Sequence, residues 1–247
     1  MKRLLPVFVG SLVVVGVALA QENKGGELTD PVEILKKVDA AAKAVKVARY
    51  KCTFERIGGG PAQVPKVEGT ALIEGWSGGG PKNFLIDATV QQPGSEDKTR
   101  ITAGGDGNEY FVIDHANKKA YVDIDQAVMG RTGRPATLIL FAEFVHETPF
   151  SDEINGQKQE LRGSKNIEGE DCYEIYVKYS GGQEAIWHFS KKDLLPRARL
   201  DIFKSPDGAE VKQQKTVSKL EVDPKLDASA FKFKLPDGYE KIEDFAP

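Results

Sequence analysis

Three histidines are the side chains in this 247-residue sequence best suited to acid–base or metal chemistry. His115, His146 and His188 lie far apart along the chain, and none belongs to a His-Glu-x-x-His pair. The sequence also has no Gly-x-Ser-x-Gly element that would place a nucleophilic serine. Isolated histidines of this kind are more often structural or surface residues than ligands. We therefore expect no catalytic site, no bound metal and no cofactor, and a secreted hydrolase is the least favoured function.

The two cysteines leave two alternatives open. Cys52 lies in "RYKCTFE" and Cys172 in "DCYEIYV", and both stretches alternate apolar and polar residues as strands do. An exported protein can form a disulfide between such residues, but small cysteines are also often simply buried. Spatial proximity cannot be inferred from spacing alone, so the Cys52–Cys172 bridge is a possibility beside two buried thiols.

Two glycine-rich stretches could be mistaken for phosphate loops. "GGGP" occurs at residues 58–61 and again at residues 78–81. A phosphate loop leads into a helix and usually carries a lysine followed by serine or threonine. Strand-like patterns follow both copies here, so we interpret them as turns.

The first twenty residues have the three parts of a secretory signal peptide. Lys2 and Arg3 precede an apolar run from Leu4 to Val17, and Ala18-Leu19-Ala20 forms a small-x-small cleavage site. The run is shorter than the roughly 20 residues that a membrane span needs. We expect cleavage after Ala20, a periplasmic or secreted protein, a flexible lead over residues 21–30 and one domain over residues 31–247.

Charge and composition limit the classes of partner. The formal net charge is −3, and charged residues of both signs are mixed along the chain without a basic patch. Proteins that bind nucleic acid normally concentrate lysine and arginine on one surface. We therefore expect no nucleic-acid partner, and we expect a monomer.

One long helix is predicted, and it comes first. Asp30 is a good N-cap, Pro31 suits the first helical position and Glu33 can complete the cap. Apolar residues recur at helical spacing as far as Val45, so we expect a helix from residue 30 to residue 47.

The rest of the chain alternates as short strands separated by turn residues. The stretch "AIWHFSKKDLLPRARLDIF", residues 185–203, is typical: two alternating runs flank a charged break. We count about eleven such strands, which favours a mainly β (α+β) fold with a curved antiparallel sheet. Residues 136–147 interrupt the strands with an apolar stretch between two prolines, which predicts one short helix.

The order of these elements and the C-terminal residues resemble a known family. "LDASAFKFKLPDGYE", residues 226–240, is similar to the closing motif of the periplasmic lipoprotein carriers of the LolA type, whose fold is shared with LolB and RseB. "AGGDGNEYFVIDHANKKAYV" resembles a hairpin of the same family. The resemblance covers nearly all of residues 30–245 and implies an incomplete antiparallel β-barrel closed by a short apolar lid helix.

The resemblance also implies an apolar cavity that holds an acyl chain. From the alternation we expect the following residues to line it, with those between 138 and 144 on the lid: Phe84, Ile86, Val112, Val122, Leu138, Leu140, Phe141, Phe144, Ile175, Val177, Trp187, Phe189, Leu200 and Ile202. A slip of one residue would exchange the two faces of a strand. The implied partners are lipid acyl chains or lipoproteins, together with a membrane-bound donor or acceptor protein.

In one respect the chain departs from the carriers. They keep an arginine before the proline that leads into the third strand, and it helps to hold the lid. Here Gly79 and Gly80 precede Pro81, so the chain lacks the arginine on which that lid latch depends. A non-enzymatic lipid or lipoprotein carrier is the favoured function. The alternative is a sensor or regulatory binding module of the envelope on the same fold.

Overall fold

The computed structural model describes residues 27–58, 64–125, 128–205 and 208–242. The predicted signal peptide and most of the predicted lead lie outside the described residues. Within the described ranges, no helix is long and apolar enough to cross a membrane.

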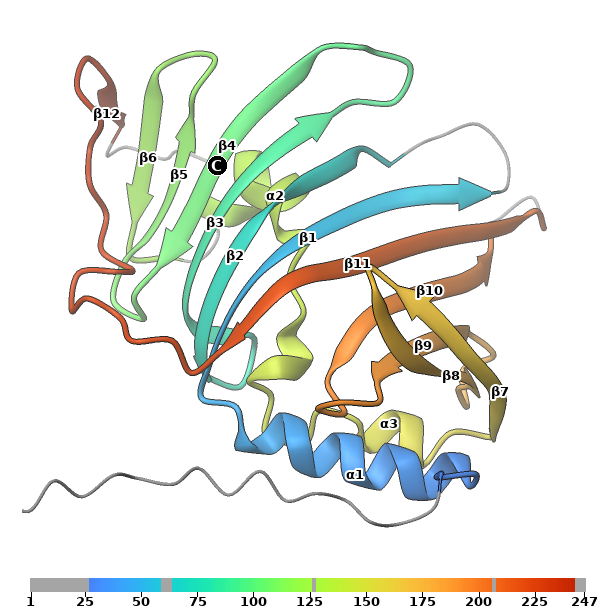
Figure 1. The fold of residues 1–247 in the computed structure, drawn as a ribbon. Helices are drawn as coiled ribbons and strands as arrows, with labels where there is room; N and C mark the ends of the chain where they lie inside the picture. Colours follow the sequence, from blue (N-terminus) through green and yellow to red (C-terminus); the bar gives the residue numbers. More distant parts are fainter. Residues whose placement is uncertain (1–26, 59–63, 126–127, 206–207, 243–247) are drawn as a thin grey trace, which may run out of the picture.

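A single curved sheet of twelve strands dominates the fold (Figure 1). The strands are β1 Val47–Gly58, β2 Lys66–Trp76, β3 Pro81–Gln91, β4 Lys98–Gly105, β5 Tyr110–Asp114, β6 Lys119–Asp123, β7 Lys158–Ile167, β8 Glu170–Lys178, β9 Glu184–Ser190, β10 Pro196–Lys204, β11 Glu210–Val222 and β12 Glu240–Ile242. Their spatial order is β12-β6-β5-β4-β3-β2-β1-β11-β10-β9-β8-β7, so the sheet stays open between β12 and β7. All pairs are antiparallel except β12 with β6. The predicted mainly β, incomplete barrel is confirmed, with one short strand more than the predicted eleven.

Helix α1 (Pro31–Ala44) packs at one end of the sheet (Figure 1). The Asp30 carboxylate caps it by accepting the Glu33 N–H at 2.7 Å, as predicted. The helix ends before the predicted residue 47, because the backbone N–H groups of Lys46 and Val47 donate to the Asp223 carboxylate, each at 2.9 Å. Val47 already belongs to β1.

The main core fills the concave side of the sheet. Alternate residues of neighbouring strands point the same way, so Tyr50 on β1 faces the same side as its partner Ala71 on β2 and as Ile86 on β3. These residues belong to one buried cluster that also contains Ile34 and Leu35 of α1. The helix therefore closes part of the concavity.

Residues 134–150, here named the covering segment, close much of the rest. The segment begins with α2 (Arg134–Thr137), which follows the π-helical turn η1 (Met129–Gly133), and it contains the 3-10 turn η2 (Ala142–Phe144). The predicted continuous helix over residues 136–147 is therefore wrong. Phe141 adopts φ −108° and ψ 85°, which breaks the helical path and turns its ring toward the sheet. Helix α3 (Ser151–Ile154) follows the segment.

The C-terminal stretch seals the convex side of the sheet. Phe231 packs with Val47 and Leu72, and Phe233 packs against Phe111 with ring centroids 5.3 Å apart. Both phenylalanines belong to the motif that carried the family resemblance. Its structural role is therefore to cover the outer face of the sheet.

Candidate functional site

Most of the predicted cavity residues lie together on the concave side. Those of the main cluster are Phe84, Ile86, Val112, Phe141, Phe144, Ile175, Val177, Trp187 and Phe189. Leu138 and Leu140 are half-buried against this cluster. Most positions predicted from the sequence alternation therefore lie on the concave side, and the covering segment lies over them.

The predicted face of Val122 is wrong. Val122 pairs with Phe111, and both belong to a separate cluster on the convex side, against Phe233 and Tyr239. Its neighbour Tyr121 packs against the main core instead. Alternation cannot choose between the faces of this strand, because the C-terminal stretch buries the outer face as well.

The predicted face of Leu200 and Ile202 is also wrong. Arg199 is the residue opposite Trp187, so Arg199 shares the concave face, while Leu200 and Ile202 share the other face with Ile186. A β-bulge between Pro196 and Ala198 shifts the register at the start of β10. Ile202 still borders the cleft described below.

The concave residues pack as a closed aromatic core in this structure. Trp187 stacks on Phe189 with an interplanar angle of 10°, and Phe150 meets both rings edge-on. Phe141 is only 1% exposed and lies 6.3 Å, between ring centroids, from Trp187. The side chains predicted to line a cavity therefore fill the concavity themselves.

Polar contacts hold the covering segment onto the sheet. The Tyr50 hydroxyl on β1 accepts the backbone N–H of Phe141 at 2.8 Å. On β11, Lys215 donates to the backbone carbonyl of Leu140 at 3.0 Å. On β10, Arg199 donates to the Glu143 carboxylate at 3.1 Å. These contacts connect the covering segment to three neighbouring strands.

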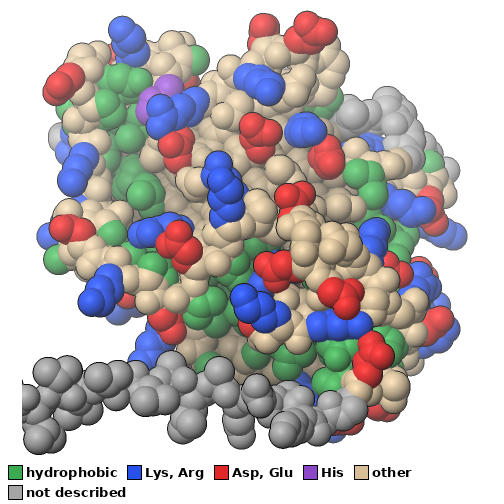
Figure 2. Space-filling model, in the orientation of Figure 1, with side chains coloured by type: hydrophobic (Ala, Val, Ile, Leu, Met, Phe, Trp, Pro, Cys, Tyr) green, Lys and Arg blue, Asp and Glu red, His purple; other side chains and the backbone are tan. Residues whose placement is uncertain are grey.

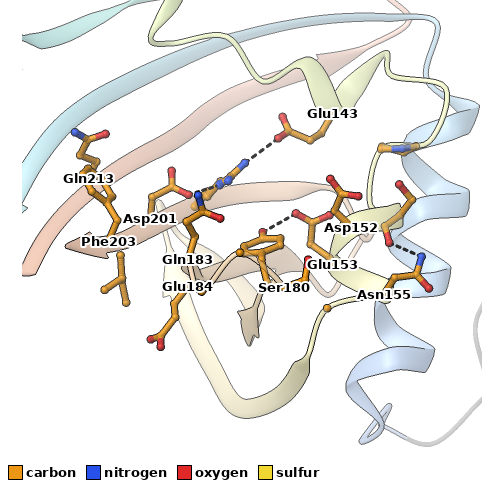
Figure 3. Close-up of a pocket in the computed structure, with 18 of the residues that line it drawn as sticks. Glu143, Asp152, Glu153, Asn155, Ser180, Gln183, Glu184, Asp201, Phe203 and Gln213 are labelled. Carbon is orange, nitrogen blue, oxygen red and sulfur yellow. Dashed lines mark hydrogen bonds and ion pairs between the residues drawn. The ribbon is translucent and has the colours of Figure 1, made fainter. Parts of the chain in front are cut away.

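An open cleft of about 1180 Å³ adjoins the covering segment (Figure 3). Its walls come from η2 and α3, the β8–β9 turn, and facing parts of β10 and β11. The charged side chains among its lining residues are Glu143, Asp152, Glu153, Glu184, Arg199, Asp201, Lys204 and Glu210. The charged side chains of the cleft are therefore mainly acidic, and its lining mixes polar and apolar surface, unlike the apolar cavity that the resemblance implied.

Arg199 stands at the boundary between this cleft and the aromatic core. Its guanidinium lies 4.8 Å from the Trp187 ring centroid and also donates to Asp201 at 2.7 Å. Burial opposes the charge of Arg199, but the carboxylates of Asp201 and Glu143 outweigh it and raise the arginine pKa. Figure 3 shows Glu143 and Asp201 reaching toward the same space from opposite walls. Arg199 thus bridges the sheet and the covering segment as a permanent cation.

A partly buried chain of hydrogen bonds leads from the core to the cleft. The Trp187 indole N–H donates to the Tyr179 hydroxyl at 3.1 Å, and that hydroxyl donates to the Glu153 carboxylate at 2.7 Å. Burial raises the pKa of Glu153, although the bond from Tyr179 opposes the shift. Burial, with the nearby Glu153 charge, also raises the pKa of Tyr179. The chain orients Trp187 and joins the cleft to the core.

The histidines do not converge. His115 bonds to Thr102 and Tyr239, His188 to Glu174, and His146 packs its ring on Trp76 at the cleft. Within the described residues, no group of three His, Cys, Asp or Glu side chains is arranged to hold a metal ion.

Both cysteines are free and buried, so the structure does not contain the possible Cys52–Cys172 bridge. Cys52 belongs to the main core and Cys172 to a small cluster with Ile167 and Ala198. Burial raises the thiol pKa of Cys52 to about 12 and that of Cys172 to about 11. Neither thiol is suited to act as a nucleophile.

The residues that sequence analysis missed are the polar ones on the concave face. The prediction considered only the apolar residues of the alternating strands, so it did not include Arg199, Lys215 and Tyr179. A signal was present for Arg199, which stands opposite Trp187 once the β9–β10 hairpin is paired in its observed register. That register depends on the bulge, which the sequence pattern does not reveal.

Comparison with known proteins gives one family match and several similar structures. Residues 88–244 match the family model described as a predicted periplasmic protein, DUF2092. No curated protein matches the chain. LprF from Mycobacterium bovis is 10% identical, with a TM-score of 0.49, over 87% of this chain and 100% of LprF. The lipoprotein LppX from Mycobacterium tuberculosis is 10% identical, with a TM-score of 0.46, over 79% and 96% of the two chains. The LolA superfamily protein NE2245 from Nitrosomonas europaea is 13% identical, with a TM-score of 0.35, over 83% and 98%.

Proposed function

Because this chain belongs to DUF2092, a family of predicted periplasmic proteins, we propose that it is a non-enzymatic binding protein of the cell envelope. Its proposed ligand is the acyl chain of a lipid or of a lipidated protein, and its proposed role is to carry that ligand between a membrane-bound donor and an acceptor. Cleavage after Ala20 would release it into the periplasm or the medium.

The observation that supports this proposal is the aromatic side of the covering segment. Phe141 and Phe144 are fully buried against the concave sheet, yet the segment that carries them is not a strand of the sheet. An outward movement of the segment would break no strand pairing. Such a movement would extend the neighbouring cleft into an apolar chamber walled by Tyr50, Trp187 and Phe189.

The energies favour exchange of the two rings for an acyl chain. Exposing two phenylalanine side chains costs about 3–6 kcal/mol, at about 1.5–3 kcal/mol each. Burying a sixteen-carbon chain from water gains on the order of 10 kcal/mol, at about 0.8 kcal/mol per CH₂ and before ordering costs. For a ligand in water, burial of the acyl chain therefore gains more free energy than exposure of the two rings costs. Extraction from a membrane has no such advantage, so a donor protein would have to present the ligand.

The experiment is titration of the mature protein with a fluorescent fatty-acyl probe, together with mass spectrometry of lipids that co-purify with it. We expect saturable binding by the wild type. Phe141→Ala should bind about 10- to 100-fold more tightly, because one displaced ring no longer has to be exposed.

Phe111→Ala is the matched control. Phe111 is equally buried, at 2% exposed, but it lies in the cluster on the convex side. Both variants should lose several kcal/mol of stability, about 3–5 for a buried phenylalanine. Only Phe141→Ala should change the probe affinity. The proposal is wrong if neither wild type nor Phe141→Ala binds the probe and no lipid co-purifies.

A further inference from the structure

Two cations stand directly opposite each other beneath the covering segment. Arg199 on β10 pairs with Lys215 on β11 in the sheet register, so both side chains leave the concave face at adjacent points. Like charges at directly opposed positions destabilise a sheet. Their position therefore calls for compensating groups, and these come mainly from the covering segment.

The two cations are compensated unequally. Arg199 has the carboxylates of Asp201 and Glu143 at 2.7 and 3.1 Å. Lys215 donates to the carbonyl oxygen of Leu140, and its ammonium lies 5.5 Å from the ring centroid of Phe141. Among the described residues, Lys215 forms no salt bridge with a carboxylate. Among the described residues, this half-buried ammonium thus contacts a neutral carbonyl and an aromatic face but no carboxylate.

Within five residues, the covering segment presents two kinds of group to the sheet. Oxygens of Leu140 and Glu143 face the two cations, and the rings of Phe141 and Phe144 enter the apolar core. An anionic amphiphile has the same pattern, with head-group oxygens joined to a hydrocarbon chain. We propose that Arg199 and Lys215 bind the carboxylate or phosphate head group of such an amphiphile, while its chain replaces the two rings.

This inference rests on the proposed acyl-binding function and deepens it by naming the head group. The contacts of Arg199 and Lys215 also hold the covering segment in place, in a chain in which Gly79 and Gly80, and not an arginine, stand directly before Pro81. Head group and covering segment would compete for the same two cations, so binding and closure exclude each other. Ligand binding would itself release the segment.

The acidic lining of the cleft does not reverse this preference. Asp152 and Glu210 are exposed, so water and salt weaken their effect on a ligand at the inner wall. Glu143 would leave with the covering segment, whereas the half-buried Asp201 stays beside Arg199 on β10, so Lys215 is the cation that mainly attracts the head group. Arg199 and Lys215 are half-buried, where the effective dielectric constant is lower and ionic contacts are stronger. Paired guanidinium and ammonium donors also match the oxygens of phosphate and carboxylate.

The test is isothermal titration of the full mature chain with four probes at 0.15 M salt. Three share a twelve-carbon chain and are used below their micelle-forming concentrations: dodecyl phosphate, dodecyl maltoside and dodecyl trimethylammonium. The fourth is inorganic phosphate. We expect dodecyl phosphate to bind at least tenfold more tightly than the uncharged and cationic amphiphiles, and inorganic phosphate to bind at least a hundredfold more weakly than dodecyl phosphate.

Three variants identify the site. Lys215→Gln should bring the affinity for dodecyl phosphate to that for dodecyl maltoside. Lys212→Gln is the control, because Lys212 lies on the same strand opposite Ile202 and faces the convex side. Lys212→Gln should leave the affinity for dodecyl phosphate unchanged. Glu143→Gln weakens the contact between Arg199 and the covering segment, which competes with the head group, and should tighten dodecyl phosphate binding severalfold. This variant tests the inference even if Lys215→Gln folds poorly.

The outcomes separate the two proposals. If all three amphiphiles bind equally and Glu143→Gln has no effect, the head-group inference is wrong and the acyl-binding function stands. Binding of inorganic phosphate as tightly as dodecyl phosphate would also overturn the inference, because the chain would then contribute nothing. If no amphiphile binds, the proposed function fails with it.

Discussion

The Tyr50 hydroxyl lies 2.8 Å from the backbone nitrogen of Phe141, 91 residues away in the sequence, and accepts its N–H in the middle of the core. Both residues are only 1% exposed. Burial raises the pKa of Tyr50 well above its usual range, so the phenol stays neutral. A neutral hydroxyl inside the core is thus one polar anchor of the covering segment, beside Lys215 and Arg199.

Tyr50→Phe should destabilise the protein by about 1–3 kcal/mol, because the buried N–H of Phe141 loses its acceptor. Denaturant unfolding measures this change. Hydrogen exchange at Phe141 should also become faster while the amides of β1 keep their protection. Tyr173→Phe, which removes a hydroxyl elsewhere in the same core cluster, is the control and should change stability by less than about 0.5 kcal/mol. Equal effects of the two variants would contradict the anchoring role.

Gly69 marks a close approach between β2 and β3. A Cβ atom at this position would lie 2.3 Å from the backbone oxygen of Asp87 and 2.7 Å from the Cα atom of Ala88. Backbone atoms of a paired strand cannot move aside, so Gly69→Ala should cost about 1–3 kcal/mol or more. Gly79→Ala, in the β2–β3 turn with nothing within 4 Å of its Cβ position, is the control. A thermal unfolding midpoint for Gly69→Ala equal to that of Gly79→Ala would show that the strands adjust freely.

Glu153 should make stability depend on pH. Its pKa is raised by burial above the ordinary value of 4.5, so the folded protein favours the protonated carboxyl. The contribution of protonated Glu153 to the free energy of unfolding is therefore fully present below pH 4.5, and it is lost as the pH rises through the higher pKa of the folded protein. Glu153→Gln keeps an oxygen that can accept the Tyr179 hydroxyl and removes the buried charge.

The expected result is a higher unfolding temperature for Glu153→Gln at pH 7–8, by about 2–4 °C for each kcal/mol regained. The difference from wild type should disappear at acidic pH. Asp152→Asn, at the exposed neighbouring position, should shift stability by no more than about 0.5 kcal/mol. A constant difference between Glu153→Gln and wild type across the pH range would contradict the assignment.

The two thiols provide a direct chemical test of the core. Denatured, unreduced protein should contain two reactive thiols, because Cys52 and Cys172 are both free. In the native protein both should react slowly near neutral pH, because they are buried and their pKa values are raised to about 12 and about 11. Fewer than two thiols after denaturation without reductant would mean that a bridge forms.

Local sequence signals predicted the elements better than the site. The Asp30 cap and the strand alternation depend on neighbouring residues, so the helix start and most strands could be found. The faces of Val122 and Leu200 could not be found, because they depend on a distant covering stretch and on a β-bulge. The partners of Lys215 lie about 75 residues away on the covering segment, and no local pattern carries that information.

The sheet order has a consequence for how the chain folds. Strand β1 lies between β2 and β11, and Ala48 pairs with Val222. The two halves of the sheet therefore join only after β11 has been synthesised, and a very long loop between β1 and β11 must close first. Sheets built on such distant contacts fold slowly, in milliseconds to seconds rather than microseconds. A fragment that stops before residue 210 would leave β1 as an exposed edge, open to pairing with other chains.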